Sequence, residues 1–328
     1  MSQLSYPLVS ARPLNSWQLM TALINGEKTP SKAWKKTSFR LKFIGRSLFC
    51  WRTTSGLLST LASNPLLDEI LNAQPNLPCK LHRPYLAANM SKIECLFALR
   101  DHYDLSTQRM PMKMLLGHLK KPFVLASAEG KSGAEGKSGA AVSLELAAID
   151  NLNKEGEATL LLRNANGIML AEITFSLMHY QQKPTLFIGG LQGANHQVPH
   201  AEIQQATKEC HGLFPKRLAL EGICALAHHL GIQQIVAVGN ATHIYQNWRY
   251  HSKKKDKLHA DYDQFWVSMG GQMLESGYFL LPKSITRKPI EEVASKKRAE
   301  YRRRYQLLDE LELGMAEHFR AQPRFTSV

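Results

Sequence analysis

The spacing of hydrophobic residues divides the chain into a helical first part, a β-rich middle, and an alternation of helices and strands after it. Between residues 141 and 188, short apolar runs are separated by polar loops, which is typical of strands joined by hairpins. The loop NANG at residues 164–167 is the clearest turn, because Asn-Gly supports positive φ. We predict an antiparallel meander with strands at residues 142–149, 158–163, 168–180 and 185–188.

The last of these strands, Thr185–Ile188, runs into a glycine-rich segment that holds Gly189, Gly190 and Gly193. Glycine permits positive φ and close approach of a ligand to backbone N–H groups, so we predict a turn at this point. Periodicity then predicts helices at 199–210 and 215–230, a buried strand at 235–238, and a helix carrying His243, Tyr245 and Trp248.

Aromatic and basic side chains alternate along residues 31–62. One apolar face at helical spacing is predicted from Trp34, Leu41, Ile44, Leu48 and Trp51, and it is broadened by Phe39, Phe43 and Phe49. Such a segment fits an interfacial helix on anionic lipid. The commoner amphipathic helix packs on a core and displays solvated charge, and this second interpretation is favoured. Single-stranded nucleic acid is a third candidate partner, because aromatic rings stack on bases while cations follow phosphates.

Together these elements predict an α+β fold, in which an antiparallel β meander continues into a mixed sheet with flanking helices. Shorter elements are expected at 66–73, 91–103, 262–269 and 278–281, and a long charged helix at 289–314. Three segments follow, namely a basic amphipathic helical N-terminal region (1–80), an α+β core (81–282), and a basic C-terminal helix and tail (283–328).

The net charge of +14 implies an anionic partner, such as nucleic acid, acidic lipid headgroups or a phosphorylated cofactor. Eight Lys or Arg residues and no acid lie between Lys28 and Leu67, and further basic clusters lie at 253–257 and 296–304. No base-reading motif accompanies them, so nucleic acid is the less favoured partner.

The five cysteines are widely spaced and none forms a CxxC pair, which argues against a zinc site and a disulfide scaffold. We therefore predict no metal site. No apolar run reaches the roughly 20 residues of a membrane-spanning helix, and no secretory signal is recognisable. A cytoplasmic location is expected, with peripheral contact at the inner membrane through residues 32–52 as an added hypothesis.

The duplicated segment AEGKSGAEGKSG, residues 128–139, contains GKS twice without forming a phosphate loop. A Walker A loop needs a glycine five positions before the glycine of GK, and Leu125 and Lys131 stand there. We interpret the duplication as a flexible turn.

Five blocks in order resemble the VirK/YbjX family of Gram-negative bacterial proteins. They are IGGLQG (188–193), ATKECHGLFPK (206–216), AVGNATHIY (237–245), YDQFWVSMGG (262–271) and KKRAEYRRRY (296–305). The resemblance covers roughly residues 81–308 and departs from the common pattern at Phe214, where Arg is frequent, and at Gly239, where Ser is frequent. It implies a role in virulence, envelope stress and survival of host antimicrobial peptides.

The order meander, glycine turn, helix, strand, helix, strand also resembles the core of the GNAT (N-acetyltransferase) fold. In that fold the pyrophosphate of acyl-CoA meets backbone N–H groups where the fourth strand hands over to a helix. The resemblance implies an acyl-CoA site at Gly189, Gly190, Gln192, Gly193 and Ala194. It also implies Tyr245 as general acid, by position.

Other candidate site residues rest on chemistry alone. His211 and His243 are candidate acid–base groups, although His211 equally suits a helix-end cap. Lys208 and Lys216 are candidate phosphate partners, against the interpretation that they are surface charges at helix ends. Arg217 and Glu221 stand at i and i+4, so an ion pair between them explains both.

Three classes of function remain open. The first is an acyl-CoA-dependent acyltransferase acting on an amine, a lipid or a protein. The second is a non-enzymatic basic protein that docks on an anionic membrane surface or on a protein partner. The third is a nucleic-acid binder, whose affinity would fall steeply with salt.

Overall fold

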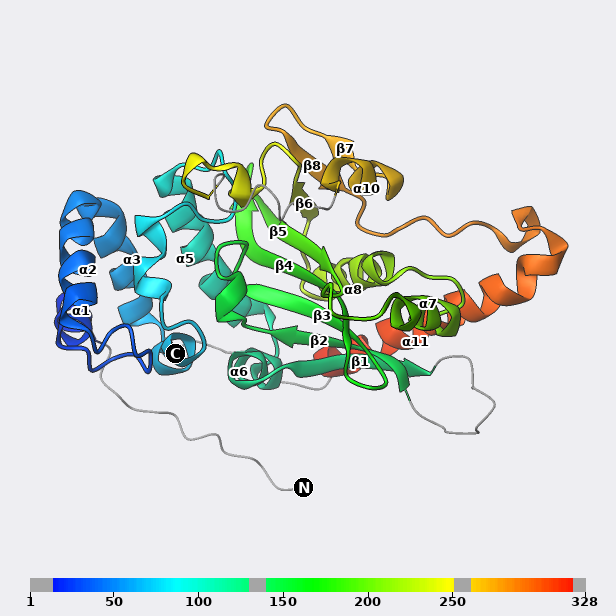
Figure 1. Ribbon diagram of the computed structural model, residues 1–328, viewed down its shortest axis with the longest axis horizontal. Helices are drawn as coiled ribbons and strands as arrows, with labels where there is room; N and C mark the ends of the chain where they lie inside the picture. The colour runs from blue at the N-terminus through cyan, green and yellow to red at the C-terminus, as the bar shows by residue number, and fades with distance from the viewer. Residues whose placement is uncertain (1–13, 130–139, 251–260, 321–328) are drawn as a thin grey trace, which may run out of the picture. The chain divides into compact units, whose positions relative to one another are not determined.

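The computed structural model describes residues 14–129, 140–250 and 261–320, so the GKS duplication and the basic cluster at 253–257 lie largely outside the described residues. The chain folds into two compact units, one up to Arg83 and one from Pro84 onward. Their helices and strands are labelled in Figure 1.

The first unit is helical. Its elements are α1 (Ser16–Asn25), α2 (Thr37–Phe49), α3 (Trp51–Ser63), α4 (Leu67–Ala73) and the 3₁₀ helix η1 (Leu77–His82). Asn15 caps α1 and Gly26 ends it with a left-handed φ of 79°. Trp34 is fully buried at the centre, where its ring meets Phe43 edge-on and its indole N–H donates to the Pro75 carbonyl.

The single apolar face predicted along residues 31–62 is wrong. The helix breaks at Cys50, so Trp51 begins a new helix rather than continuing the face of α2. Phe43 and Ser47 are the buried residues of α2, whereas Leu41 and Leu48 are 63% and 68% exposed. Packing on Trp34 buries Phe43, which belongs to the broadened predicted face, and leaves Leu41 and Leu48 of the same predicted face in contact with solvent.

The second unit is built on a mixed sheet. Its described strands are β1 (Phe123–Glu129), β2 (Ala140–Ala147), β3 (Ala158–Asn164), β4 (Met169–Tyr180), β5 (Lys183–Gly193), β6 (Gln234–Val238), β7 (Gln272–Met273) and β8 (Tyr278–Leu281). They lie in the order β1-β2-β3-β4-β5-β6-β8-β7. Adjacent strands are antiparallel except β5 and β6, which are parallel. The predicted meander and mixed sheet are confirmed, and β1 was not predicted.

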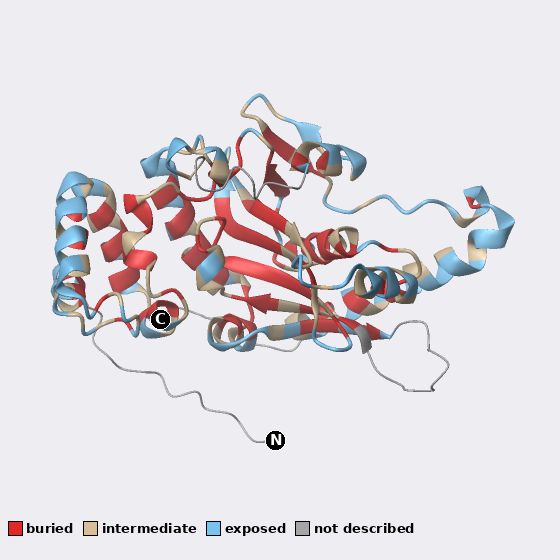
Figure 2. Cartoon of the chain, in the orientation of Figure 1, coloured by how far each residue is buried: buried red, intermediate tan, exposed pale blue. Residues whose placement is uncertain are grey.

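Helices cover both faces of this sheet. They are α5 (Lys92–Arg109), α6 (Met112–Lys120), α7 (His200–Glu209), α8 (Pro215–His229), α10 (Tyr262–Ser268) and α11 (Arg298–Arg320). Gly222 of α8 packs on Leu144 and Leu160 on one face of the sheet. Side chains alternate between the two faces along a strand, so Glu157 lies on the face opposite to Leu160. There the Tyr103 hydroxyl of α5 donates a hydrogen bond to Glu157. Figure 2 shows the buried residues concentrated in the central strands and in the helix faces against them.

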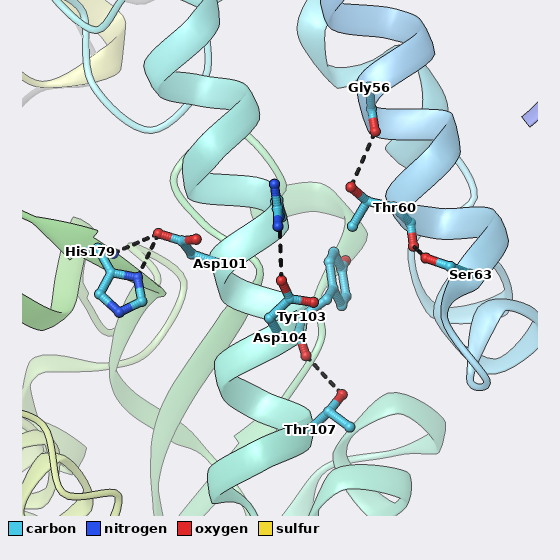
Figure 3. Close-up of polar contacts among 9 residues, drawn as sticks. Gly56, Thr60, Ser63, Asp101, Tyr103, Asp104, Thr107 and His179 are labelled. Atoms are coloured by element: carbon cyan, nitrogen blue, oxygen red, sulfur yellow. Dashed lines mark hydrogen bonds and ion pairs between the residues drawn. The ribbon is translucent and has the colours of Figure 1, made fainter. Parts of the chain in front are cut away.

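Helix α5 is fixed to β4 by polar contacts near its middle. Asp101 accepts hydrogen bonds from the backbone N–H of His179, at 2.8 Å, and pairs with its ring Nδ1 at 3.0 Å, as Figure 3 shows. The His102 ring accepts from the Leu177 N–H at 3.1 Å. These bonds satisfy the backbone of β4 at a point where α5 crosses it.

The C-terminal helix begins later than predicted. Residues 289–297 form two 3₁₀ turns, Ile290–Glu292 and Ser295–Lys297, and α11 starts at Arg298. Val293 is buried in an extended conformation between the turns, and Arg298 donates to its carbonyl at 3.0 Å. Burial of Val293 thus outweighs the helical periodicity of this stretch.

Candidate functional site

The glycine-rich segment continues strand β5 and does not form a turn. Strand β5 runs to Gly193 and stays paired with β4 along this length, with Gly193 opposite Ala171. Gly189, Gly190 and Gly193 are absent from the positive-φ positions of the described residues. The predicted turn is therefore wrong, because the long strand β4 offers a pairing partner that the local sequence does not reveal.

Glu155 explains why Gly189 and Gly190 are glycines. A Cβ atom on Gly190 would lie 2.0 Å from Glu155 Oε2, and one on Gly189 would lie 2.0 Å from the Glu155 carbonyl oxygen. Only glycine lets the Glu155 segment approach the strand this closely. The Glu155 carboxyl group fills the space beside Gly190, and its backbone carbonyl fills the space beside Gly189. A cofactor-binding role for these two glycines stays a prediction.

Strands β5 and β6 part after a short parallel ladder. Their pairing covers Thr185–Ile188 and ends at Ile188 opposite Ala237, while β5 continues for five more residues. In the gap, the Tyr262 hydroxyl accepts from the Leu191 N–H at 3.1 Å and donates to the Leu191 carbonyl at 3.0 Å. One side chain thus satisfies both backbone groups that β6 leaves open.

Asn240 ties the end of β6 to helix α10. Its side-chain oxygen accepts from the Tyr262 N–H at 2.8 Å, and its amide nitrogen donates to Asp261 at 2.9 Å. Its backbone N–H donates to Asp263 at 2.7 Å. Through Leu191, Asn240 and Tyr262, the blocks at 188–193, 237–245 and 262–271 converge on one place in the fold.

A buried carboxyl and a buried imidazole face each other at this place. His243 Nε2 lies 3.9 Å from Glu155 Oε1, and both side chains are 2% exposed. Neither atom has a hydrogen-bond partner among the described residues. His243 Nδ1 accepts from the Tyr245 backbone N–H at 3.3 Å, so the ring proton of the neutral form belongs on Nε2, toward Glu155.

Burial moves the pKa values of this pair in opposite directions. It raises the pKa of Glu155 to about 7, against smaller lowering effects of hydrogen bonds from Tyr245 and Gln192. It lowers the pKa of His243 to about 4. At neutral pH the imidazole is therefore neutral, while Glu155 is poised to gain or lose a proton.

Tyr245 and Gln192 complete the contacts of Glu155. The Tyr245 hydroxyl donates to the carboxyl group, and Gln192 Nε2 donates to Oε2 at 3.4 Å. Burial and the charge of Glu155 hold the pKa of Tyr245 well above its usual range. Tyr245 lies in the short 3₁₀ turn Ile244–Gln246, so the predicted helix through His243 and Trp248 is wrong at this point.

A half-exposed polar strip on the sheet leads to Glu155. Glu172 of β4 is opposite Gln192 of β5, and Arg163 of β3 pairs with Glu145 of β2 through a 3.0 Å contact. All four side chains are intermediate in exposure. Burial raises the pKa of Glu172, while Arg163 lowers it. With Glu155 included, carboxyl groups outnumber the single cation on this strip.

The structure separates the other predicted site residues into two places. Lys216 belongs with the cluster, because its Cε would lie 3.3 Å from a Cβ placed on Gly193. Burial lowers the pKa of Lys216. His211 and Lys208 instead line a cleft of about 350 Å³ with Glu300 and Arg303.

His211 has a left-handed backbone, with φ of 53°, in the turn after α7. Its carbonyl accepts two hydrogen bonds from Arg304, at 2.7 and 3.0 Å. These contacts anchor the turn to α11 and favour the structural interpretation of His211. A catalytic role for His211 stays a prediction without a place in the cluster.

A larger cavity lies elsewhere, between α8, α11 and residues 283–287, and measures about 720 Å³. Glu221 lies on its wall, and Arg217 contacts Glu221 at 3.7 Å, as the i, i+4 spacing predicts. Most of the other lining is apolar.

Glu155 is not among the predicted site residues. It lies in the polar loop between β2 and β3, and no motif around it distinguishes it from an ordinary surface acid. A signal was nevertheless present in the chain. Two adjacent glycines inside a strand indicate that another segment approaches the backbone there.

The comparisons with known proteins identify the family of this chain. Residues 32–317 match the family described as "Protein of unknown function (DUF535)". The chain belongs to the DUF535 family, of VirK/YbjX type. It is 48% identical over 322 residues, covering 98% of this chain and 96% of the relative, to the Escherichia coli protein named "Uncharacterized protein YbjX".

Two further relatives of this DUF535 protein are more distant. An uncharacterized protein of Haemophilus influenzae is 31% identical over 163 residues, covering 50% of this chain and 53% of the relative. A Mannheimia haemolytica protein named "Membrane protein LapB" is 26% identical over 225 residues, covering 69% of this chain and 92% of the relative. Within the described residues, none of the helices combines the length and the apolar character needed to cross a bilayer.

Proposed function

We propose that the protein is an acyl-CoA-dependent acyltransferase that acylates a cationic amine, with Glu155 as general base. The observation that carries the proposal is a pair of buried polar atoms, Glu155 Oε1 and His243 Nε2, that have no hydrogen-bond partner within the described part of the chain. Buried polar groups without partners are rare in folded proteins and are typical of functional sites.

The sheet topology supports a GNAT-like core. Meander strands β1 to β5 are followed by two helices, a parallel strand β6, and an antiparallel strand β8. The divergence of β5 and β6 after Ile188 leaves a V-shaped opening in the hydrogen-bond ladder. In the GNAT fold the acyl-CoA site lies at such an opening. Here Tyr262 holds the Leu191 backbone groups inside it.

The residues after Leu191 fit an anionic cofactor better than the earlier glycines do. Gln192, Gly193 and Ala194 are only half-buried, and the end of the Lys216 side chain lies beside Gly193. Lys216 is also the second residue of α8, where backbone N–H groups are unsatisfied within the helix. These residues would hold the pyrophosphate of acyl-CoA, which supplies an activated acyl group when bound.

The chain's own groups can manage the proton transfers of acyl transfer to an amine. The acidic strip with Glu172 and Glu145 attracts an ammonium group. The ammonium group first loses one proton to solvent, because only the free amine has a lone pair that can attack. Glu155, with a pKa of about 7, removes a second proton as the nitrogen attacks. Tyr245, hydrogen-bonded to Glu155, donates a proton to the departing thiolate and regains one from Glu155. The N–C bond forms, the C–S bond breaks, and the net reaction releases the one proton that the ammonium group lost first.

We propose that this chemistry serves the bacterial envelope. Acylation of an amine removes a positive charge, and cationic antimicrobial peptides act through positive charge. A relative carries the name "Membrane protein LapB". A role in virulence, envelope stress and antimicrobial-peptide resistance is therefore the biological setting that we propose for this reaction.

Calorimetric titration of the full-length protein with coenzyme A and with acetyl-CoA tests the cofactor assignment. We expect binding that Lys216→Met weakens about tenfold, since it removes one charged phosphate contact. Lys208→Met is the matched control, because Lys208 lies in the cleft with His211. Absence of binding, or equal losses in both variants, would contradict the cofactor site.

A further inference from the structure

The first unit displays large apolar side chains to solvent beside its basic residues. Phe49 is 96% exposed, Leu48 68% and Leu41 63%, all on α2. Trp17 of α1 is 66% exposed, and its ring lies 5.3 Å from that of Trp51 at the start of α3. Single exposed apolar residues are ordinary, but five in one short helical unit mark an interaction surface.

A small basic cavity adjoins α2. It measures about 200 Å³ and is lined by Phe39, Lys42, Phe43, Arg46, Asn76, Cys79, His82 and Arg83. Three of these residues are cations and none is an acid. Arg46 and Arg83 both lie close enough to the Cys79 thiol to lower its pKa, although burial raises that pKa more strongly, to about 12. Their positive charges therefore converge inside the cavity.

Lys42 is shared between this cavity and a second hollow. The second hollow measures about 350 Å³ and is lined by Lys32, Ala33, Lys36, Ser38, Phe39 and Lys42. Its charged lining residues are again all basic. The sequence has no acid between Lys28 and Leu67, so no neighbouring carboxylate in this stretch neutralises the charge.

Helical geometry places the two kinds of residue side by side. Residues three and four apart share a face, so Leu41 and Leu48 form one column and Lys42 and Arg46 form the next. Both columns face solvent, because Phe43 and Ser47 are the buried side of α2. An apolar column next to a basic column is the arrangement of a helix that lies at a membrane interface.

We propose that the first unit binds anionic phospholipid, with the headgroup phosphate in the cavity of Lys42, Arg46 and Arg83. Leu41, Leu48 and Phe49 enter the boundary between headgroups and acyl chains. Two of the three exposed apolar side chains of α2, Leu41 and Leu48, have no ring that could stack on a base, so this face fits acyl chains better than a nucleic-acid platform. The site is independent of the acyltransferase proposal, since all its residues precede Pro84.

Vesicle flotation with the full-length protein tests the proposal. Vesicles of phosphatidylcholine with about 30 mol% phosphatidylglycerol are compared with vesicles of phosphatidylcholine alone, because anionic lipid adds to the attraction at each basic residue. We expect flotation with the first, a blue shift of tryptophan emission on binding, and little flotation with the second. Equal flotation with both, or none with either, overturns the proposal.

Variants separate the two columns. Lys42→Gln with Arg46→Gln should weaken binding to anionic vesicles about tenfold, and Leu48→Ser with Phe49→Ser should do the same. The matched controls are Lys120→Gln with Lys121→Gln, and Leu313→Ser, which change comparable exposed residues of the second unit. Far-UV circular dichroism verifies folding.

Two outcomes contradict the site itself. If a control variant loses as much binding as its partner, the attraction is diffuse charge and the cavity is not used. If a single-stranded oligonucleotide binds with the same dependence on Arg46 while vesicles do not bind, the surface is for nucleic acid. Coenzyme A binding by the Lys42 and Arg46 variant should be unchanged, which distinguishes this proposal from the acyltransferase proposal.

Discussion

His243 Nε2 lies 3.9 Å from Glu155 Oε1, and neither buried atom has a hydrogen-bond partner among the described residues. The separation is too long for a direct hydrogen bond, so these two atoms keep the desolvation penalty of unpaired polar atoms. Folded proteins keep such pairs where a ligand or a reaction uses them. The pair links the loop before β3 to the segment after β6, and the Glu155 segment lies against Gly189 and Gly190 of β5.

Glu155→Gln should change how stability depends on pH. The folded-state pKa of Glu155 is about 7 against an ordinary 4.5, so the folded chain binds more protons than the unfolded chain between these values. Stability from this group is therefore lost as pH rises from 4.5 to 7. The variant should gain up to about 3 kcal/mol relative to the wild type across that window. Urea unfolding at intervals of pH measures it, and a constant difference would refute the assignment.

His243→Gln should show the opposite trend. The pKa of His243 is lowered from 6.5 to about 4, so the folded chain binds fewer protons than the unfolded chain in that range. Stability from this group rises as pH rises from 4 to 6.5, and the variant should lack that rise. His228→Gln, at an exposed position of α8, is the control and should leave the profile unchanged. Equal profiles for both variants would contradict the burial of His243.

Gly190→Ala should destabilise the fold by about 2 kcal/mol or more, because overpacking against a buried group forces strain. The added Cβ would lie 2.0 Å from Glu155 Oε2. Combining it with Glu155→Ala should recover part of the loss, which a double-mutant cycle measures as coupling. Gly45→Ala, whose Cβ meets nothing within 4 Å on helix α2, should instead stabilise by about 0.5–1 kcal/mol. Additive effects at positions 155 and 190 would show that the contact is absent.

Tyr262→Phe should loosen the opening between β5 and β6. The change leaves the Leu191 N–H and carbonyl without their hydroxyl partner, at a cost of about 1–3 kcal/mol. Hydrogen exchange at the Leu191 amide should accelerate more than exchange elsewhere in β5. Tyr301→Phe on α11 is the control. Unchanged protection at Leu191 would mean that Tyr262 does not close the strand.

Much of the fold follows from local pattern. Strands β4, β6 and β8 and helix α8 are predictable because apolar periodicity, proline and glycine mark their ends within the chain. The extension of β5 through Gly189 and Gly190 is not, since glycine carries no periodic signal. That extension exists because β4 is long enough to pair with it.

The candidate site divides in the same way. Tyr245, His243 and Gln192 are recognisable from the blocks that contain them, whereas Glu155 becomes visible only when its loop packs on β5. On α2 the local pattern instead predicts burial for residues that are exposed. Periodicity predicts a buried face through Leu41 and Leu48, but the position of Trp34 decides which face is buried.

The most direct test of the account is the pH dependence of amine-dependent thiol release from acetyl-CoA. Wild-type kcat/KM should rise with pH to a plateau above the Glu155 pKa of about 7. Glu155→Gln should lower kcat/KM about 10²–10⁴-fold, as loss of a general base does, and should abolish its rise with pH. Glu317→Gln, at an exposed position of α11, should do neither. No thiol release with any cationic amine, or an unaltered profile in Glu155→Gln, would contradict the proposal.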